Sequence, residues 1–149
     1  TGVQTCALPI YLTSWTIAGT WQHVINDQTR TVAFAQHVRS RYDSEDDDSN
    51  DSNLSVGGVS LLRTVGDWAF QVTPFAGWDA ERNVRADGSR LLFGALASTR
   101  YRWTEALEVT LNGGLQRSIY DRESGLFLVG RDDIQVDLGA SLKIGRAHV

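Results

Sequence analysis

The sequence predicts an all-β fold: an antiparallel up-and-down meander of about seven strands that forms part of a transmembrane β-barrel. Three observations lead to this prediction. Polar and apolar residues alternate with a period of two along most of the chain. Short and long connections between the alternating segments follow each other in strict order. Most of the tryptophans and tyrosines lie toward the ends of these segments.

The alternation is clearest in LEVTLNGGLQRSIY and IQVDLGASLK, where leucine, valine, isoleucine or alanine occupies every second position except Gly113 and Arg117, and mainly polar residues lie between them. WAFQVTPFAGW and YLTSWTIAGTWQHVI repeat the pattern, which is typical of strands with one apolar and one polar face. TVAFAQHVRSRY and LLFGALASTRYRW alternate less regularly, and the two glycines of LSVGGVSLLR leave its faces unresolved. The predicted strands are 11–25, 29–43, 54–64, 68–80, 91–102, 106–120 and 132–143.

The connections between these strands alternate in length. Short ones are expected around 26–28, 65–67 and 104–105, and long ones at 44–53, 82–90 and 122–131. Transmembrane barrels have short periplasmic turns and longer extracellular loops, whereas the crossovers of a soluble sandwich would break this order. The strands also exceed the usual length in globular proteins and are long enough to cross a bilayer. The connections therefore favour the membrane barrel.

Aromatic residues near the strand ends suggest interfacial girdles, although ordinary sheet packing would also explain any single one of them. The girdle candidates are Trp15, Trp21, Trp68, Trp78, Tyr101, Trp103 and Tyr120.

Charged residues within the strands are expected to face the barrel lumen if the apolar face meets lipid. There they form an ion-pair lattice that rigidifies the barrel or line a selective path, and the sequence leaves both readings open. The lumen-facing candidates are Arg39, Arg41, Arg100, Arg102, Glu108, Asp137 and Lys143. Pro74 within a strand predicts a bulge, because proline removes a ladder hydrogen bond.

The two ends of the chain differ in composition from the middle. Residues 1–10 back-translate to ACTGGAGTTCAGACGTGTGCTCTTCCGATC and residues 144–149 to ATCGGAAGAGCACACGTC, which is the reverse complement of a stretch inside the first string. Both match a common short-read sequencing adapter. We therefore expect 1–10 and 144–149 to be adapter-derived, and 11–143 to be a fragment of an outer-membrane β-barrel domain.

Composition excludes several functions for this body. Without Arg146, the 14 Lys and Arg residues become 13 against 18 Asp and Glu, a net charge of −5, which disfavours nucleic-acid binding. No Cys remains to form a disulfide or a thiolate metal site. His23 and His37 lack a convincing catalytic trio, so we expect no enzyme, catalytic residue, metal site or cofactor. The acidic stretch RYDSEDDDSNDSN is either a calcium site or, as charge runs usually are, a solvated loop.

A more particular likeness covers 88–143. The arrangement Y-D…LF…R-D-D…D-L-G-x-S-L over its last two strands resembles the C-terminal barrels of the surface lipoprotein assembly modifier family and related putative porins of Gram-negative bacteria. The resemblance implies a periplasmic helical-repeat domain before the barrel and a role in delivering lipoproteins to the cell surface. The chain departs from that pattern because it contains no helical repeat.

The expected location is the bacterial outer membrane, and the expected partners are outer-membrane lipid and a lipoprotein or small solute as cargo. The first functional hypothesis is transport or export through or along a polar lumen. A structural or adhesive barrel with a plugged lumen is the second, and a soluble lipocalin-like ligand-binding barrel with its apolar face inward is the third.

Overall fold

The computed structural model describes residues 12–42, 51–81, 88–123 and 130–145. These residues form one antiparallel sheet in the order β1-β2-β3-β4-β5-β6-β7, so the predicted all-β, up-and-down meander is confirmed. The strands are β1 Leu12–Asn26, β2 Thr29–Tyr42, β3 Ser52–Val65, β4 Trp68–Glu81, β5 Arg90–Arg102, β6 Leu107–Glu123 and β7 Gly130–Ile144. None of the described residues forms a helix long and apolar enough to cross a membrane.

The strand boundaries lie close to the predicted ones, and the largest extension is three residues at the end of β6. β6 continues to Glu123, and β7 ends at Ile144, which is paired with Leu107 of β6. The sheet therefore includes Ile144, the first residue of the predicted adapter segment. Residues 1–10 lie outside the described part of the chain, as do 43–50 of the acidic stretch.

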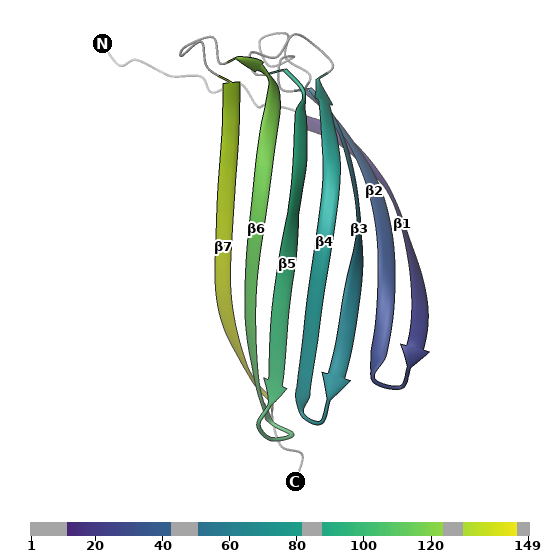
Figure 1. The fold of residues 1–149 in the computed structure, drawn as a ribbon, viewed down its shortest axis with the longest axis vertical. Helices are drawn as coiled ribbons and strands as arrows, with labels where there is room; N and C mark the ends of the chain where they lie inside the picture. The colour runs from purple at the N-terminus through teal and green to yellow at the C-terminus, as the bar shows by residue number, and fades with distance from the viewer. Residues whose placement is uncertain (1–11, 43–50, 82–87, 124–129, 146–149) are drawn as a thin grey trace, which may run out of the picture.

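Short turns join the strands at one end of the sheet, drawn at the bottom of Figure 1. Gly66 has φ 58° in the two-residue turn between β3 and β4, as tight hairpins require. Between β1 and β2, the side chain of Asn26 accepts a hydrogen bond of 3.0 Å from the backbone N–H of Gln28. The strand ends that border the long connections lie together at the opposite end (Figure 1). The predicted alternation of short and long connections is thereby confirmed.

The predicted bulge at Pro74 is wrong. The register of β3 against β4 keeps the same offset from Gly58 opposite Phe75 to Leu61 opposite Val72, and Pro74 itself is opposite Ala95 of β5. The side chains of Ser60 and Thr73 form a buried hydrogen bond of 2.8 Å beside the proline. This bond connects the two strands where the proline has no N–H to donate.

The sheet is strongly curved and open (Figure 1). β1 and β7 are its edge strands, and they pair only with β2 and β6 respectively among the described residues. Both edges run in the same direction because five strands separate them in an antiparallel meander. The sheet thus has the curvature of a barrel wall without being closed.

Candidate functional site

The sheet has two chemically different faces, and the cross-strand register defines them. Residues that are opposite one another on paired strands share a face, so the alternation of each strand can be followed across the sheet. One face, called the convex face here, carries most of the large apolar side chains: Trp15, Ile17, Trp21, Val59, Leu61, Phe70, Val72, Trp78, Leu91, Phe93, Leu111, Leu115, Ile134, Val136, Leu138 and Leu142.

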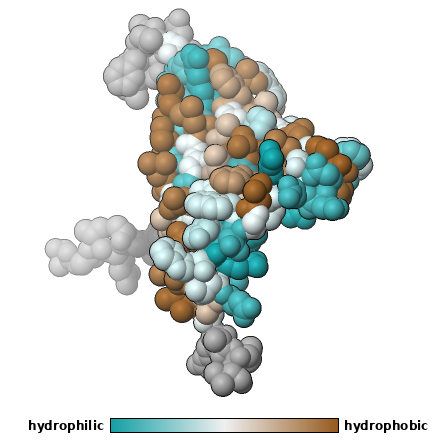
Figure 2. Space-filling model, turned by 60° about the horizontal axis from the view of Figure 1, so that its bottom comes forward, coloured by the Kyte–Doolittle hydropathy of each residue, from teal (hydrophilic) through white to brown (hydrophobic). Residues whose placement is uncertain are grey.

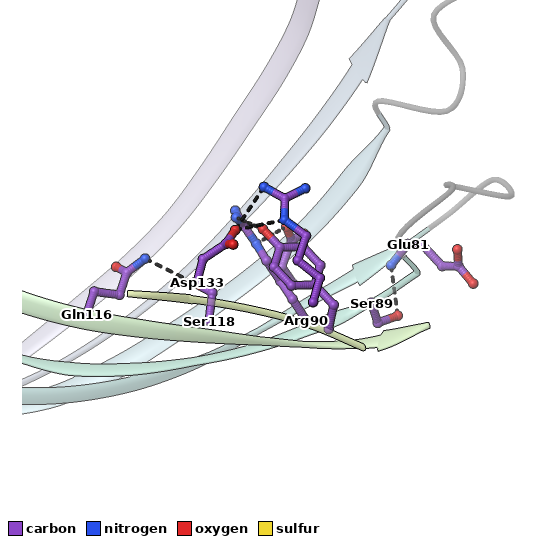
Figure 3. Close-up of polar contacts among 9 residues, drawn as sticks. Glu81, Ser89, Arg90, Gln116, Ser118 and Asp133 are labelled. Atoms are coloured by element: carbon purple, nitrogen blue, oxygen red, sulfur yellow. Dashed lines mark hydrogen bonds and ion pairs between the residues drawn. The ribbon is translucent and has the colours of Figure 1, made fainter. Parts of the chain in front are cut away.

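The opposite face, called the concave face here, carries mainly small and polar side chains. They include Ser60, Thr73, Gln71, Ser98, Arg90, Arg100, Asn112, Gln116, Ser118, Asp133, Gln135 and Asp137. Side chains on the inside of a curved sheet crowd together, while those on the outside spread apart. Figure 3 shows Arg90, Asp133, Gln116 and Ser118 projecting from the same side of the sheet, beneath the strands that curve over it.

Burial is inverted relative to a water-soluble protein. Ser60, Thr73, Asp79 and Ser118, all on the concave face, are buried, whereas Leu92 is the one buried apolar residue among those described. On the convex face, Leu138 is 86% exposed. In Figure 2 apolar side chains line the left flank of the molecule, and others lie over its middle and its right-hand arm among hydrophilic ones. Exposed apolar side chains in such number on one face are typical of a surface that contacts an apolar medium or a partner.

Aromatic side chains border this apolar surface at both ends. At the short-turn end the rings of Trp68 and Tyr101 are 4.5 Å apart, Phe70 stacks on Trp68, and Trp103 contacts Tyr101 edge-on. At the long-connection end lie Trp15, against His37, and Trp78. Ten residues separate Trp68 from Trp78, which is about 33 Å along a strand and about 25 Å along the axis of a barrel with strands tilted by about 40°.

Glycines accommodate the larger side chains on the concave face. Phe34 of β2 is opposite Gly58 of β3, and Phe75 of β4 is opposite both Gly58 and Gly94 of β5. A β-carbon at Gly58 would lie 2.7 Å from the Phe34 ring, and one at Gly94 would lie 2.9 Å from the Phe75 ring. Aromatic rings therefore cover glycines of neighbouring strands in one row, which lets the inner face stay closely packed where the sheet bends.

A network of charges occupies the long-connection end of the concave face (Figure 3). Arg90 forms an ion pair of 3.0 Å with buried Asp79 and donates a hydrogen bond of 3.4 Å to the hydroxyl of Tyr120. Arg131 lies over the Tyr120 ring, 4.6 Å from its centroid, and pairs with Asp133 at 2.8 Å. The network thus crosses four consecutive strands, from β4 to β7, and balances each of its carboxylates with a guanidinium.

A second pair extends this network at the strand ends. Arg122 forms an ion pair of 2.5 Å with Glu81, and the backbone N–H of Glu81 donates to the hydroxyl of Ser89 at 3.2 Å. Three carboxylates and three guanidiniums are therefore paired at this end. These ion pairs can hold β4 to β7 together at the long-connection end. They can also block the passage of ions along the concave face.

The short-turn end of the concave face is more open. A groove of about 650 Å³ lies there, lined mainly by polar side chains that include Gln22, Arg30, Gln71, Arg100 and Glu108. Arg100 and Glu108 are 3.7 Å apart, and the Arg100 side chain is half exposed. Charges in this groove therefore remain accessible to water.

Five of the predicted lumen-facing residues lie on the concave face: Arg100, Arg102, Glu108, Asp137 and Lys143. Arg102 is opposite Glu108, and Glu108 is opposite Lys143, so these three form one row at the short-turn end. Asp137 lies farther along, opposite Gly114, and accepts a hydrogen bond of 3.0 Å from Gln135.

Arg39 and Arg41 do not share this face, which corrects the sequence prediction. Arg39 is opposite Trp15 and Arg41 is opposite Thr13, so both belong to the convex face. The local pattern of β2 misleads because Val32, Phe34 and Val38 make its other face look apolar. Pairing with the tryptophan-bearing face of β1 decides the orientation instead.

Tyr120 also departs from prediction, since it is opposite Arg90 on the concave face and is not among the convex aromatic residues. The other girdle candidates in strands, Trp15, Trp21, Trp68, Trp78 and Tyr101, lie on the convex face, and Trp103 follows β5 in the adjoining turn.

Sequence reasoning missed the charges of the long-connection end. Asp79 and Glu81 continue the odd-numbered polar series of Gln71 and Thr73 in β4, so their parity was a usable signal. Their partners are Arg90 of β5, 11 residues from Asp79, and Arg122 of β6, 41 residues from Glu81, and the register between strands brings these pairs together.

The chain was compared with protein-family models, curated proteins and solved structures, and none of them matches it.

Proposed function

We propose that this chain forms part of the wall of a bacterial outer-membrane β-barrel. In this proposal the convex face lies against lipid and the concave face lines a polar route across the membrane. The observation that carries the proposal is the inverted burial: polar side chains are covered on the inside of the curve, and large apolar side chains are exposed on the outside. Lipid is the medium in which such a surface is stable.

The aromatic residues support the same arrangement. Trp68, Tyr101 and Trp103 at one end and Trp15 and Trp78 at the other suit the two membrane interfaces, and the ~25 Å between Trp68 and Trp78 equals the usual height of an apolar barrel band. A soluble ligand-binding barrel would require the opposite curvature, with its apolar face inside.

The proposed cargo is a small polar solute or a segment of a lipoprotein. Polar side chains on the concave face, and the water-accessible groove at its short-turn end, suit passage of hydrophilic groups. Lipoprotein delivery rests only on the sequence resemblance over 88–143.

A structural barrel with a closed interior is the second candidate. The paired charges at the long-connection end favour it, because Asp79, Arg90, Glu81 and Arg122 form a neutral lattice across the inner face. Such a lattice stabilises a wall without providing a selective path.

Two experiments test these candidates, and the second separates them. Partition between buffer and detergent tests membrane residence, and we expect the protein to require detergent; a monomer that stays soluble without detergent would contradict both candidates. Planar-bilayer recordings then test the route. Conductance supports passage, and silence at every voltage and salt concentration supports the closed barrel.

Replacing Asp79 and Arg90 together by Asn and Gln should raise the conductance of a closed barrel. Replacing the matched pair on the convex face, Arg117→Gln with Asp132→Asn, should leave the conductance unchanged.

A further inference from the structure

The convex face carries two arginines that the membrane-wall proposal does not use. Arg39 and Arg41 lie near the long-connection end of β2, on the same face as Trp15, Ile17 and Trp21. Among the described residues, neither guanidinium has a carboxylate within ion-pair distance. The other arginine in the same half of this face, Arg117, is by contrast paired with Asp132, with its Nε 2.9 Å from Oδ1.

A cationic side chain on a lipid-facing strand is unfavourable in the apolar band and tolerated near the interface. Arg39 is opposite Trp15, an interfacial aromatic residue in the proposed orientation, so the guanidinium can reach the headgroup level by extending along the surface. At that level the planar guanidinium binds phosphate oxygens in a bidentate manner. Two arginines at this position, without an ion-pair partner in the described part of the chain, therefore suit an anionic headgroup.

A hollow lies beside these arginines, toward the middle of the same face. Its volume is about 520 Å³. On the convex face it is lined by Ile17, Gly19, Ala35, His37, Ser55 and Gly57. His37 is two residues from Arg39 along β2 and lies on the same face. The hollow therefore begins next to the arginines, on the side toward the middle of the sheet.

Small residues create the hollow. Gly19 is opposite Ala35, and Ala35 is opposite Gly57, so three neighbouring strands lack bulky side chains at one level. A β-carbon at Gly19 would meet nothing within 4 Å. On the side of the hollow nearest the arginines, His37 and Ser55 form a hydrogen bond of 2.8 Å between Nδ1 and Oγ. This bond satisfies these polar groups on an otherwise apolar face.

We propose that Arg39, Arg41 and the hollow below them bind one phosphate-bearing lipid of the membrane leaflet at the long-connection end. The arginines hold the headgroup phosphate, and an acyl chain lies in the hollow over Gly19, Ala35 and Gly57. This inference rests on the proposed membrane location, since it requires the convex face to contact lipid.

The test is a titration of the full chain in uncharged detergent micelles with bis-phosphorylated lipid A, followed by native mass spectrometry. We expect Arg39→Gln with Arg41→Gln to weaken lipid binding on the order of tenfold or more. Arg63→Gln is the matched control, because Arg63 lies on the same face at the short-turn end, opposite Phe70. Gly19→Leu should weaken binding by filling the hollow, and Ala140→Leu, on the exposed convex side of β7, should not.

Lipid A without phosphates should bind the unaltered protein about as weakly as the double arginine variant binds the phosphorylated form. Inorganic phosphate alone should not compete, because the acyl chain contributes to the site. Equal lipid affinity in the arginine variants and the Arg63→Gln control would overturn the inference while leaving the membrane location intact. A protein that needs no detergent to remain monomeric would overturn the location itself.

Discussion

The ring of Phe34 lies over Gly58 of the neighbouring strand so closely that a β-carbon at position 58 would be 2.7 Å from the ring. The same β-carbon would be 2.6 Å from the carbonyl oxygen of Pro74. Glycine at this position is therefore required by the packing of the concave face, not by an unusual backbone angle.

Replacing Gly58 by alanine should destabilise the sheet. Because the new methyl group meets a backbone oxygen that cannot move independently, we expect a loss of about 1–3 kcal/mol in the free energy of unfolding. Urea unfolding in micelles measures this change. Gly19→Ala is the matched control and should show no loss, since its side chain would enter open space. Equal loss in both variants would mean that the inner packing is not as close as described.

Neutralising Asp79 tests the charge network of the long-connection end. Asp79→Asn keeps the shape of the side chain but removes the ion pair with Arg90, which is two-thirds buried. We expect destabilisation of about 2 kcal/mol, after allowing for solvent screening of the arginine. Glu108→Gln, in the more open pair with Arg100, should cost less than about 1 kcal/mol. A larger effect at Glu108 would mean that the ion pair at the short-turn end stabilises the sheet more than the charge network at the long-connection end.

The hydrogen bond between Ser60 and Thr73 is predicted to stabilise the sheet beside Pro74. Thr73→Val leaves the buried hydroxyl of Ser60 without this partner and should cost about 1–2 kcal/mol in unfolding experiments. Combining Thr73→Val with Ser60→Ala should recover part of the loss, because no Ser60 hydroxyl is then left buried without a partner, although Gln71 still loses its hydrogen bond of 3.2 Å to Thr73. Additive losses in the double variant would argue against a direct bond.

A depth series tests the lipid-facing assignment of β3 and β4. Val72 lies between the aromatic residues Trp68 and Trp78 on the convex face, whereas Val65 is opposite Trp68. In folding titrations with phospholipid vesicles, Val72→Arg should cost about 2–4 kcal/mol and Val65→Arg about 0–1 kcal/mol. Similar costs at both positions would indicate that this surface does not span a bilayer.

Period-two alternation and the order of the connections were sufficient to predict the strands, their number and their sequential pairing. Each strand pairs with its neighbour in the chain, so local signals define the topology. Faces were also predictable where one parity is clearly apolar, as with Val136 and Leu138 of β7. Tyr120 could have been placed correctly from its parity with Gln116 and Ser118.

The face of β2 could not be predicted in this way. Its apolar residues Val32, Phe34 and Val38 lie on the concave face, where Gly58 of β3 leaves room for the Phe34 ring. That complementarity depends on the register between strands, which alternation alone does not specify. The partners of Arg90 and Arg122 were hidden for the same reason, since their carboxylates come from β4.

The most direct test of the central claim is the environment of successive residues along β7. Single cysteines at positions 135, 136, 137 and 138, in a Cys6→Ser background, can be labelled after reconstitution into vesicles and probed with lipid-borne and water-borne quenchers. We predict that labels at 136 and 138 respond to the lipid-borne quencher and those at 135 and 137 to the water-borne one. The same response at all four positions, or the opposite alternation, would contradict a membrane wall with its convex face in lipid.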